Sequence, residues 1–297
     1  MKKVVSLILP IFSLLFLSSC SKEYTVNFVS LGRDTVSTVV VNRGDIIPYP
    51  DIDVEDGYYI EWYSDSNKTE FFDSENMPNR DITLYAHQVL LGLSFQEQTG
   101  EIRNYSGNLR DIVIPSVIRG HKVRVIYNES FKSKGLRSVS IPNSVEEINY
   151  FAFFDNKLTN VTIPNSVTEI GDYAFNGNLL ETVNLSTSLT SIGEYAFANN
   201  ALSFVEIPES VTTIGNYAFN GSDEFLCGNS ITRLNLSEGL RTIGDYAFSG
   251  NHILTLEIPN SVDTIGDYAF SYNQLTSVSI PESLSTIGDG IFSNNQL

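Results

Sequence analysis

The chain has 297 residues, of which 18 are lysine or arginine and 35 are aspartate or glutamate, so its formal net charge is −17. The acidic residues are scattered along the sequence rather than gathered in runs, which indicates a solvated surface. This charge argues against nucleic acid as a partner, because binding to phosphates needs a basic stripe.

The N-terminus has the pattern of an export signal. Two lysines precede an apolar run over residues 4–17, and two serines and Cys20 follow it. This order is typical of a signal peptide, and the run is too short for a comfortable membrane span. The ending LSSC resembles the cleavage site of a bacterial lipoprotein signal. The resemblance implies a signal peptide over 1–19, a lipid on Cys20 and a short linker over 20–22. A plain secretory signal with an accidental cysteine is the alternative.

Residues 20–24, CSKEY, partly resemble the tag that sends Bacteroidetes lipoproteins to the outer face of the cell. We therefore expect a lipid anchor in the bacterial outer membrane, with the folded part exposed on the cell surface. After cleavage Cys227 would be the only free thiol, so an internal disulfide is not possible. The fold must then be stabilised by packing alone.

Residues 23–89 predict a small β module. The stretches YTVNFVS, TVVVN and ITLYAHQV have the composition and alternation of strands. Trp62 lies between them, and we interpret it as a core residue, since so small a unit needs large aromatic side chains in its core. The order of parts, including the Gly-aromatic-x-x-x-Trp-aromatic centre from Gly57 to Tyr63, resembles the Listeria–Bacteroides repeat. That resemblance implies a β-grasp-like module with no catalytic residues.

From Leu136 onward six apolar columns recur at a fixed period. The step is 22 residues, as from Ile141 to Ile163, except for one step of 29 from Ile207 to Leu236. Such a period is typical of a solenoid in which each repeat forms one coil and buries its apolar residues against its neighbours. The part L-x-x-V-x-I predicts a parallel strand that ends at the following proline.

The repeat L-x-x-L-x-L-P-x-x-L-x-x-I-G-x-x-A-F closely resembles the BspA-type leucine-rich repeat. We assign the array to 90–297, with 93–135 as its N-terminal cap. The resemblance implies a mainly β protein, in which the β-grasp-like module precedes a right-handed leucine-rich repeat solenoid with short helical turns. The glycine of each repeat, such as Gly171, suits a tight bend with positive φ. The last coil stops at Leu297 without a polar cap, so the chain is either a fragment or has an end that something else covers.

One polar position precedes the Tyr-Ala-Phe part of the repeats. Two explanations are open: a carboxylate ladder for calcium, or a cap on a helical turn that starts at the tyrosine. Asn216 lacks the charge but keeps the capping ability, which favours the cap, so we expect no metal site. We expect the tyrosine column on the convex side, with its hydroxyls in water. The capping column consists of Asp172, Glu194, Asn216, Asp245, Asp267 and Asp289.

The sequence predicts no catalytic residues and no cofactor. His87, His121 and His252 lie far apart in the sequence, and none has a serine or cysteine elbow nearby. No pair of cysteine and histidine residues has zinc spacing. Cys227 has no basic neighbour that would activate its thiol. We therefore expect a binding protein rather than an enzyme.

The candidate ligand site lies on the predicted strands, where the residues between the apolar columns face outward. Phe204 is a large aromatic on a face where most of the outward residues are small and polar, and aromatics are favoured binding anchors. The following coil holds the insertion, and insertions in solenoids often mark the binding face. The predicted ligand-binding residues are Phe204, Glu206, Arg233, Asn235, Phe225 and Leu226.

These features predict a surface-anchored binding protein. The resemblance to BspA-type proteins implies an adhesin for host matrix proteins or for surface proteins of a host or neighbouring cell, with glycans as further possible ligands. The membrane would be contacted through the lipid on Cys20. One alternative is a glycan-capturing lipoprotein for nutrient uptake, which would need several aromatics stacked on one face. Another is a purely structural component of the envelope.

Overall fold

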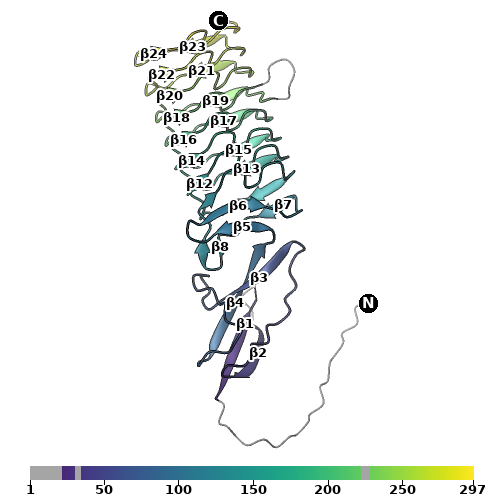
Figure 1. Ribbon diagram of the computed structural model, residues 1–297. Helices are drawn as coiled ribbons and strands as arrows, with labels where there is room; N and C mark the ends of the chain where they lie inside the picture. Colours follow the sequence, from purple (N-terminus) through teal and green to yellow (C-terminus); the bar gives the residue numbers. More distant parts are fainter. Residues whose placement is uncertain (1–21, 31–34, 222–227) are drawn as a thin grey trace, which may run out of the picture.

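The computed structural model describes residues 22–30, 35–221 and 228–297. Every regular element in these ranges is a strand (Figure 1). No helix in the described part of the chain could cross a membrane. The predicted signal peptide, its Cys20, and the insertion residues Phe225, Leu226 and Cys227 lie outside the described residues.

The β module is a four-stranded sheet at one end of the molecule (Figure 1). Its order is β2-β1-β4-β3, with β1 and β4 parallel and the other pairs antiparallel. Phe28 is fully buried in the core of this sheet, and Trp62 packs edge-on against it with 5.1 Å between ring centroids. Trp62 therefore packs against the core as expected, but it stays partly exposed. The strands are β1 (Glu23–Val29), β2 (Thr35–Asn42), β3 (Tyr58–Tyr63) and β4 (Ile82–Leu90).

Six short strands form the cap between this sheet and the first regular coil. The hairpin of β5 and β6 is antiparallel, and β6 then pairs in parallel with β10, which starts the stack of coils. The cap shares one hydrophobic core with the coils that follow, so it closes the first coil against solvent. Its strands are β5 (Leu93–Gln96), β6 (Glu101–Tyr105), β7 (Asp111–Val113), β8 (Val117–Ile118), β9 (His121–Lys122) and β10 (Val125–Ile126).

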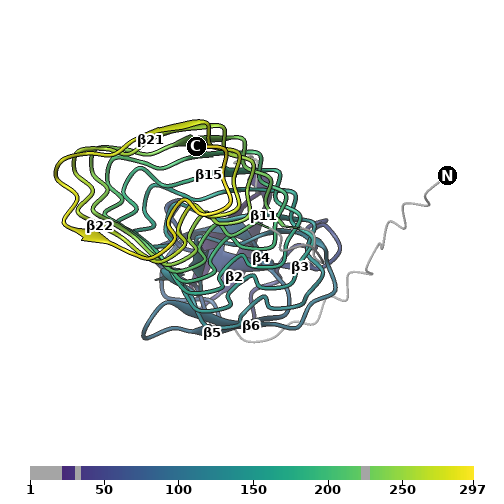
Figure 2. The same cartoon turned by 90° about the horizontal axis from the view of Figure 1, so that it is seen from above.

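Each regular coil contributes one three-residue strand and one two-residue strand, and the view along the stack shows the coils lying over one another (Figure 2). The two-residue strands continue the cap hairpin as a ten-stranded sheet, which the sequence did not predict. The three-residue strands stand at the predicted L-x-x-V-x-I part and pair only two by two.

The three-residue strands are β11 (Ser138–Ser140), β13 (Asn160–Thr162), β15 (Thr182–Asn184), β17 (Phe204–Glu206), β19 (Arg233–Asn235), β21 (Thr255–Glu257) and β23 (Ser277–Ser279). The two-residue strands are β12 (Glu147–Ile148), β14 (Glu169–Ile170), β16 (Ser191–Ile192), β18 (Thr213–Ile214), β20 (Thr242–Ile243), β22 (Thr264–Ile265) and β24 (Thr286–Ile287).

A ladder of stacked phenylalanines runs through the centre of the coils. Neighbouring rings are nearly parallel, with centroids 5.2–5.5 Å apart from Phe153 to Phe270. A buried asparagine in each coil lies beside this ladder. The Nδ2 group of Asn178 donates to the carbonyl oxygens of Phe153 and Phe175, and its Oδ1 accepts from the backbone N–H of Leu158. Because buried amides are costly when unpaired, these bonds fix the spacing of neighbouring coils.

The predicted short helical turns are wrong for the described residues. The Tyr-Ala-Phe segment forms isolated turns, in which the N–H of Asn176 donates to the carbonyl oxygen of Tyr173. Tyr173 has a φ of 58°, and this left-handed conformation is incompatible with a right-handed helix. The matching tyrosines of the next four coils share it, at 195, 217, 246 and 268.

The prediction of positive φ at the repeat glycines is also wrong. Gly171 and its counterparts do not have positive φ; the left-handed residue is the tyrosine two positions later. A Cβ atom on Gly171 would lie 2.8 Å from backbone atoms of Asn149 and Tyr150 in the preceding coil. Glycine is therefore required because neighbouring coils approach each other closely at this point.

Candidate functional site

The three-residue strands carry a row of exposed side chains, which we call the strand face: the outward residues of β7, β11, β13, β15, β17, β19, β21 and β23. β17 and β19 pair in parallel, with Phe204 opposite Arg233 and Glu206 opposite Asn235. The structure thus brings together four of the six predicted ligand-binding residues. The other two, Phe225 and Leu226, lie outside the described residues.

Phe204 and Arg233 form a cation–π pair on this face. The guanidinium carbon of Arg233 lies 4.6 Å from the centroid of the Phe204 ring. The ring is partly buried and the arginine is exposed, so the pair presents both an apolar surface and a positive charge. Sequence reasoning selected both residues but missed their contact. The step of 29 residues, which places both in one column, is the signal that could have revealed it.

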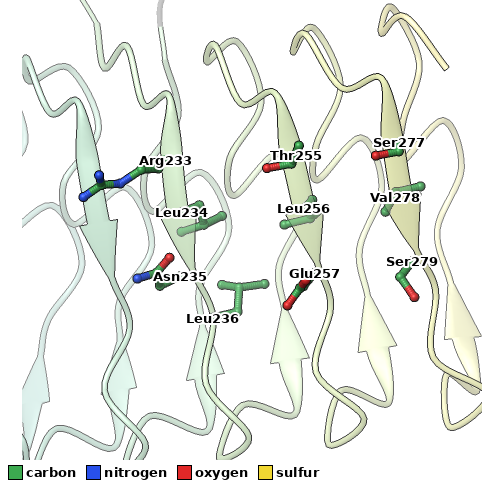
Figure 3. A pocket seen from close by; sticks show the side chains of 10 residues that line it. All are labelled: Arg233, Leu234, Asn235, Leu236, Thr255, Leu256, Glu257, Ser277, Val278 and Ser279. Atoms are coloured by element: carbon green, nitrogen blue, oxygen red, sulfur yellow. The ribbon is translucent and has the colours of Figure 1, made fainter.

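A groove of about 700 Å³ adjoins this pair, across β19, β21 and β23 (Figure 3). The buried side chains of Leu234 and Leu256 form its floor. The polar groups that surround this floor are exposed and comprise a guanidinium, an amide, a carboxylate and three hydroxyls. They belong to Arg233, Asn235, Glu257, Thr255, Ser277 and Ser279. An apolar floor with a few separate polar groups is suited to binding an extended peptide or loop.

The polar column before the tyrosines has a different role from both explanations considered above. Oδ1 of Asp172 accepts a hydrogen bond from the backbone N–H of Glu194, one coil further on, at 2.8 Å. Asn216 makes the same bond to the N–H of Asp245. The column therefore links neighbouring coils instead of capping a helical turn. Among the described residues, no group of three or more acidic, histidine or cysteine side chains is suited to a metal ion.

The tyrosine column forms a second ladder of stacked rings. From Tyr173 to Tyr268 neighbouring ring centroids are 4.5–5.1 Å apart. Burial, together with the neighbouring tyrosines, raises the pKa of Tyr195 to about 12. Because each ring covers the face of the next, the column exposes ring edges and leaves little free face for a ligand.

The three histidines lie in different settings. His87 on β4 is buried, and its Nε2 lies 3.3 Å from the carbonyl oxygen of Val117. Burial lowers the pKa of His87 to about 4. His121 is exposed on β9, 4.0 Å from the carboxylate of Glu97. His252 is exposed in the loop before β21.

Comparison with known proteins identifies two families along the chain. The BspA type leucine-rich repeat region matches residues 103–226 and 223–297, and the Listeria–Bacteroides repeat domain matches residues 24–87. No curated protein sequence matches the chain.

Two solved structures are similar to the repeat array. A leucine-rich repeat protein from Bacteroides ovatus is 27% identical with a TM-score of 0.58, and the match covers 69% of this chain and 55% of that one. The T. pallidum leucine-rich repeat protein is 25% identical with a TM-score of 0.50, and the match covers 68% of this chain and 85% of that one. The chain thus spans little more than half of the Bacteroides ovatus protein.

Proposed function

The chain belongs to the BspA-type leucine-rich repeat proteins, whose repeats match more than half of its length, and we propose that it is a surface-anchored adhesin. Its ligands are matrix or cell-surface proteins of a host or neighbouring cell, bound through the strand face. Leucine-rich repeat arrays typically bind proteins and carry no catalytic centre, which supports a binding role over an enzymatic one.

The observation that carries the proposal is the position of the Phe204–Arg233 pair beside the groove. Aromatic and arginine side chains contribute most of the binding energy in many protein interfaces. Here they lie next to each other on the strand face, and exposed hydroxyl, amide and carboxylate groups continue that face to β23. The pair can therefore serve as the central anchor of an interface, and the polar groups around it can form the rim.

The proposed location is the outer face of the bacterial outer membrane, with the lipid on Cys20. The first described strand, β1, belongs to the sheet at the end of the molecule opposite Leu297 (Figure 1). An anchor that precedes β1 would therefore hold the β module near the membrane and direct the coils away from it. The β module would then serve as a spacer, and the strand face would be accessible to other cells.

The alternative of glycan capture for nutrient uptake has weaker support. Stacking of sugars requires free aromatic faces. The tyrosine column has several aromatic rings, but neighbouring rings stack with 4.5–5.1 Å between their centroids and so cover each other's faces. On the strand face β17 carries Phe204, and the guanidinium of Arg233 already covers that ring.

The test is binding of the purified chain to a panel of matrix proteins and neutral glycans, with Phe204→Ser beside the parent protein. Saturable binding to a matrix protein that the substitution weakens supports the adhesin. Binding to neutral glycans alone favours nutrient capture. A folded protein that binds nothing on the panel favours a structural role in the envelope.

A further inference from the structure

Basic residues are concentrated at the cap end of the repeat array. From Leu158 onward the only lysine or arginine residues in the sequence are Arg233 and Arg241, whereas acidic residues recur in the coils. Four basic residues of the first coils make no ion pair within the described part of the chain; by contrast, Arg103, Arg119, Arg124 and Lys132 lie 2.6–3.2 Å from carboxylates. We call the four basic residues without an ion pair the basic corner: Arg110, Lys134, Arg137 and Lys157.

The backbone brings the basic corner together at the edge of the strand face. Arg110 and Arg137 directly precede β7 and β11, which pair in register. The N–H of Arg137 donates to the carbonyl oxygen of Arg110 at 2.6 Å, so the two residues occupy one column in neighbouring coils. A Cβ atom on Gly135 would lie 3.6 Å from Nε of Arg110, which places that side chain over the turn before β11.

The two lysines lie in the turns that precede β11 and β13, in neighbouring coils. The N–H of Lys157 donates to the carbonyl oxygen of Leu136, and the N–H of Lys134 donates to Oδ1 of Asn156. The basic corner thus covers neighbouring coils at one place on the surface. Arg110, Arg137 and Lys157 are exposed, and Lys134 is partly exposed.

This concentration of charge opposes folding rather than assisting it. Like charges in one column of neighbouring strands repel each other. The nearest acidic residues along the chain do not relieve the repulsion by ion pairing. The carboxylate of Asp111 is bound by the hydroxyl of Ser138, and that of Asp155 by the hydroxyl of Ser133. Features that oppose stability are typical of functional sites.

We infer that the basic corner is a binding site for a sulfated polysaccharide. Arginine guanidinium groups bind the oxygens of such anions in pairs, and lysines add mobile positive charges. Neighbouring coils are about 4.8 Å apart by strand spacing, which is roughly the length of one sugar unit. Sulfates on successive sugars can therefore reach basic residues on successive coils.

The surroundings favour a flexible polysaccharide over other polyanions. A DNA duplex is stiff and carries one charge per about 1.7 Å of its axis. It would run from the basic corner onto the acidic coils and be repelled there. A flexible chain contacts the corner and then leaves the surface. The site lies toward the opposite end of the strand face from the Phe204–Arg233 pair, so it is a second ligand site that does not depend on the proposed adhesin function.

The test uses the chain from Ser21 onward, which contains every described residue, and heparin immobilised on a sensor surface. Two double variants, R110Q/R137Q and K134Q/K157Q, are compared with R43Q/R80Q, which removes two exposed arginines of the β module and leaves the same net charge. Desulfated heparin, poly-glutamate and a DNA duplex serve as competing probes. Circular dichroism and thermal unfolding show that each variant is folded.

We expect heparin to bind with an affinity that falls steeply as salt rises. Each variant of the basic corner should lose at least about tenfold in affinity, because two charge-assisted contacts are removed; R43Q/R80Q should lose less than about twofold. Desulfated heparin, poly-glutamate and DNA should compete weakly. Absence of heparin binding, or equal losses in all three variants, would overturn the inference. Equal or better competition by poly-glutamate or DNA would also overturn it, and would point to an acidic protein segment or a nucleic acid instead.

Discussion

The carboxylate of Glu61 accepts a hydrogen bond from the backbone N–H of Arg119, with 2.8 Å between the two atoms. Glu61 lies on β3 and is only 5% exposed, and Arg119 lies in the turn between β8 and β9 of the cap. The hydroxyls of Tyr59 and Tyr63 donate to the same carboxylate. This fully bonded buried group joins the β module to the repeat array.

Replacing Glu61 with alanine should weaken that junction. The substitution leaves two tyrosine hydroxyls and the N–H of Arg119 without their acceptor, which should cost about 3 kcal/mol of unfolding free energy. Unfolding in urea, followed by the fluorescence of Trp62 in the β module, measures the loss. The exposed Glu55→Ala is the matched control and should change stability by less than about 0.5 kcal/mol. Equal stability of the two variants would show that the junction contributes nothing.

The buried asparagine of each coil, which lies beside the phenylalanine ladder, should be required for the stacking of coils. Asn178→Ala removes the amide that bonds Phe153, Phe175 and the N–H of Leu158, so we expect a loss of about 3 kcal/mol. Thermal and urea unfolding of the array, followed by far-ultraviolet circular dichroism, measure the change. Asn143→Ala, at an exposed asparagine, is the control. A loss below about 1 kcal/mol at position 178 would mean that packing of the phenylalanines alone sets the coil spacing.

The repeat glycines should tolerate no side chain. In Gly215→Ala the new methyl group would lie 2.8 Å from backbone atoms of Gly193 and Glu194, so neighbouring coils must move apart. We expect a loss of about 2–3 kcal/mol. Gly44 has a φ of 84° but open space around it, so Gly44→Ala should cost only about 1 kcal/mol, from backbone strain. Gly215→Ala should therefore have the lower melting temperature. A lower melting temperature for Gly44→Ala would contradict the conclusion that the close approach of neighbouring coils requires glycine at position 215.

Stability should depend on pH through His87. Burial lowers the pKa of His87 from 6.5 to about 4, so the unfolded chain binds a proton in this range and the folded chain does not. The unfolding free energy is therefore highest above pH 6.5 and falls as the pH falls toward 4, with a limiting slope of at most about 1.4 kcal/mol per pH unit. Urea unfolding between pH 7 and pH 5 measures this slope, above the range in which most carboxylates titrate.

His87→Gln should flatten that slope, while His121→Gln, at an exposed histidine, should leave it unchanged. If His87→Gln kept the full slope, the titrating group would have to be sought elsewhere in the chain.

The periodic part of the fold could be predicted from the sequence. Because the apolar columns recur every 22 residues, their burial follows from stacking of coils, and positions such as Val161 and Ile163 are buried as expected. The contact between Phe204 and Arg233 was also accessible, since both stand in one column. The expectation of a β protein with leucine-rich repeats was therefore correct.

The backbone geometry within each coil could not be predicted in the same way. In the coils of Tyr173 to Tyr268 the tyrosine has a positive φ and the glycine two positions earlier does not. The sequence is the same whichever of the two residues is left-handed, and glycine is the residue that ordinarily adopts a positive φ. The helical turns were expected for the same reason, because Tyr-Ala-Phe is compatible with a helix when only local preference is considered. The basic corner, whose four side chains make no ion pair within the described part of the chain, is visible in the sequence only once the coils are placed side by side.

The central claim is that the strand face binds proteins through the Phe204–Arg233 pair. The most direct measurement is the affinity of the chain from Ser21 onward for a panel of immobilised matrix proteins, with Phe204→Ser and Tyr272→Asn compared with the parent. Tyr272 is also an exposed aromatic but lies outside the strand face, and asparagine tolerates its φ of 53°. We predict saturable binding to at least one matrix protein, at least tenfold weaker for Phe204→Ser and unchanged for Tyr272→Asn. Binding that is unaffected by Phe204→Ser, or weakened equally by both variants, would contradict the account.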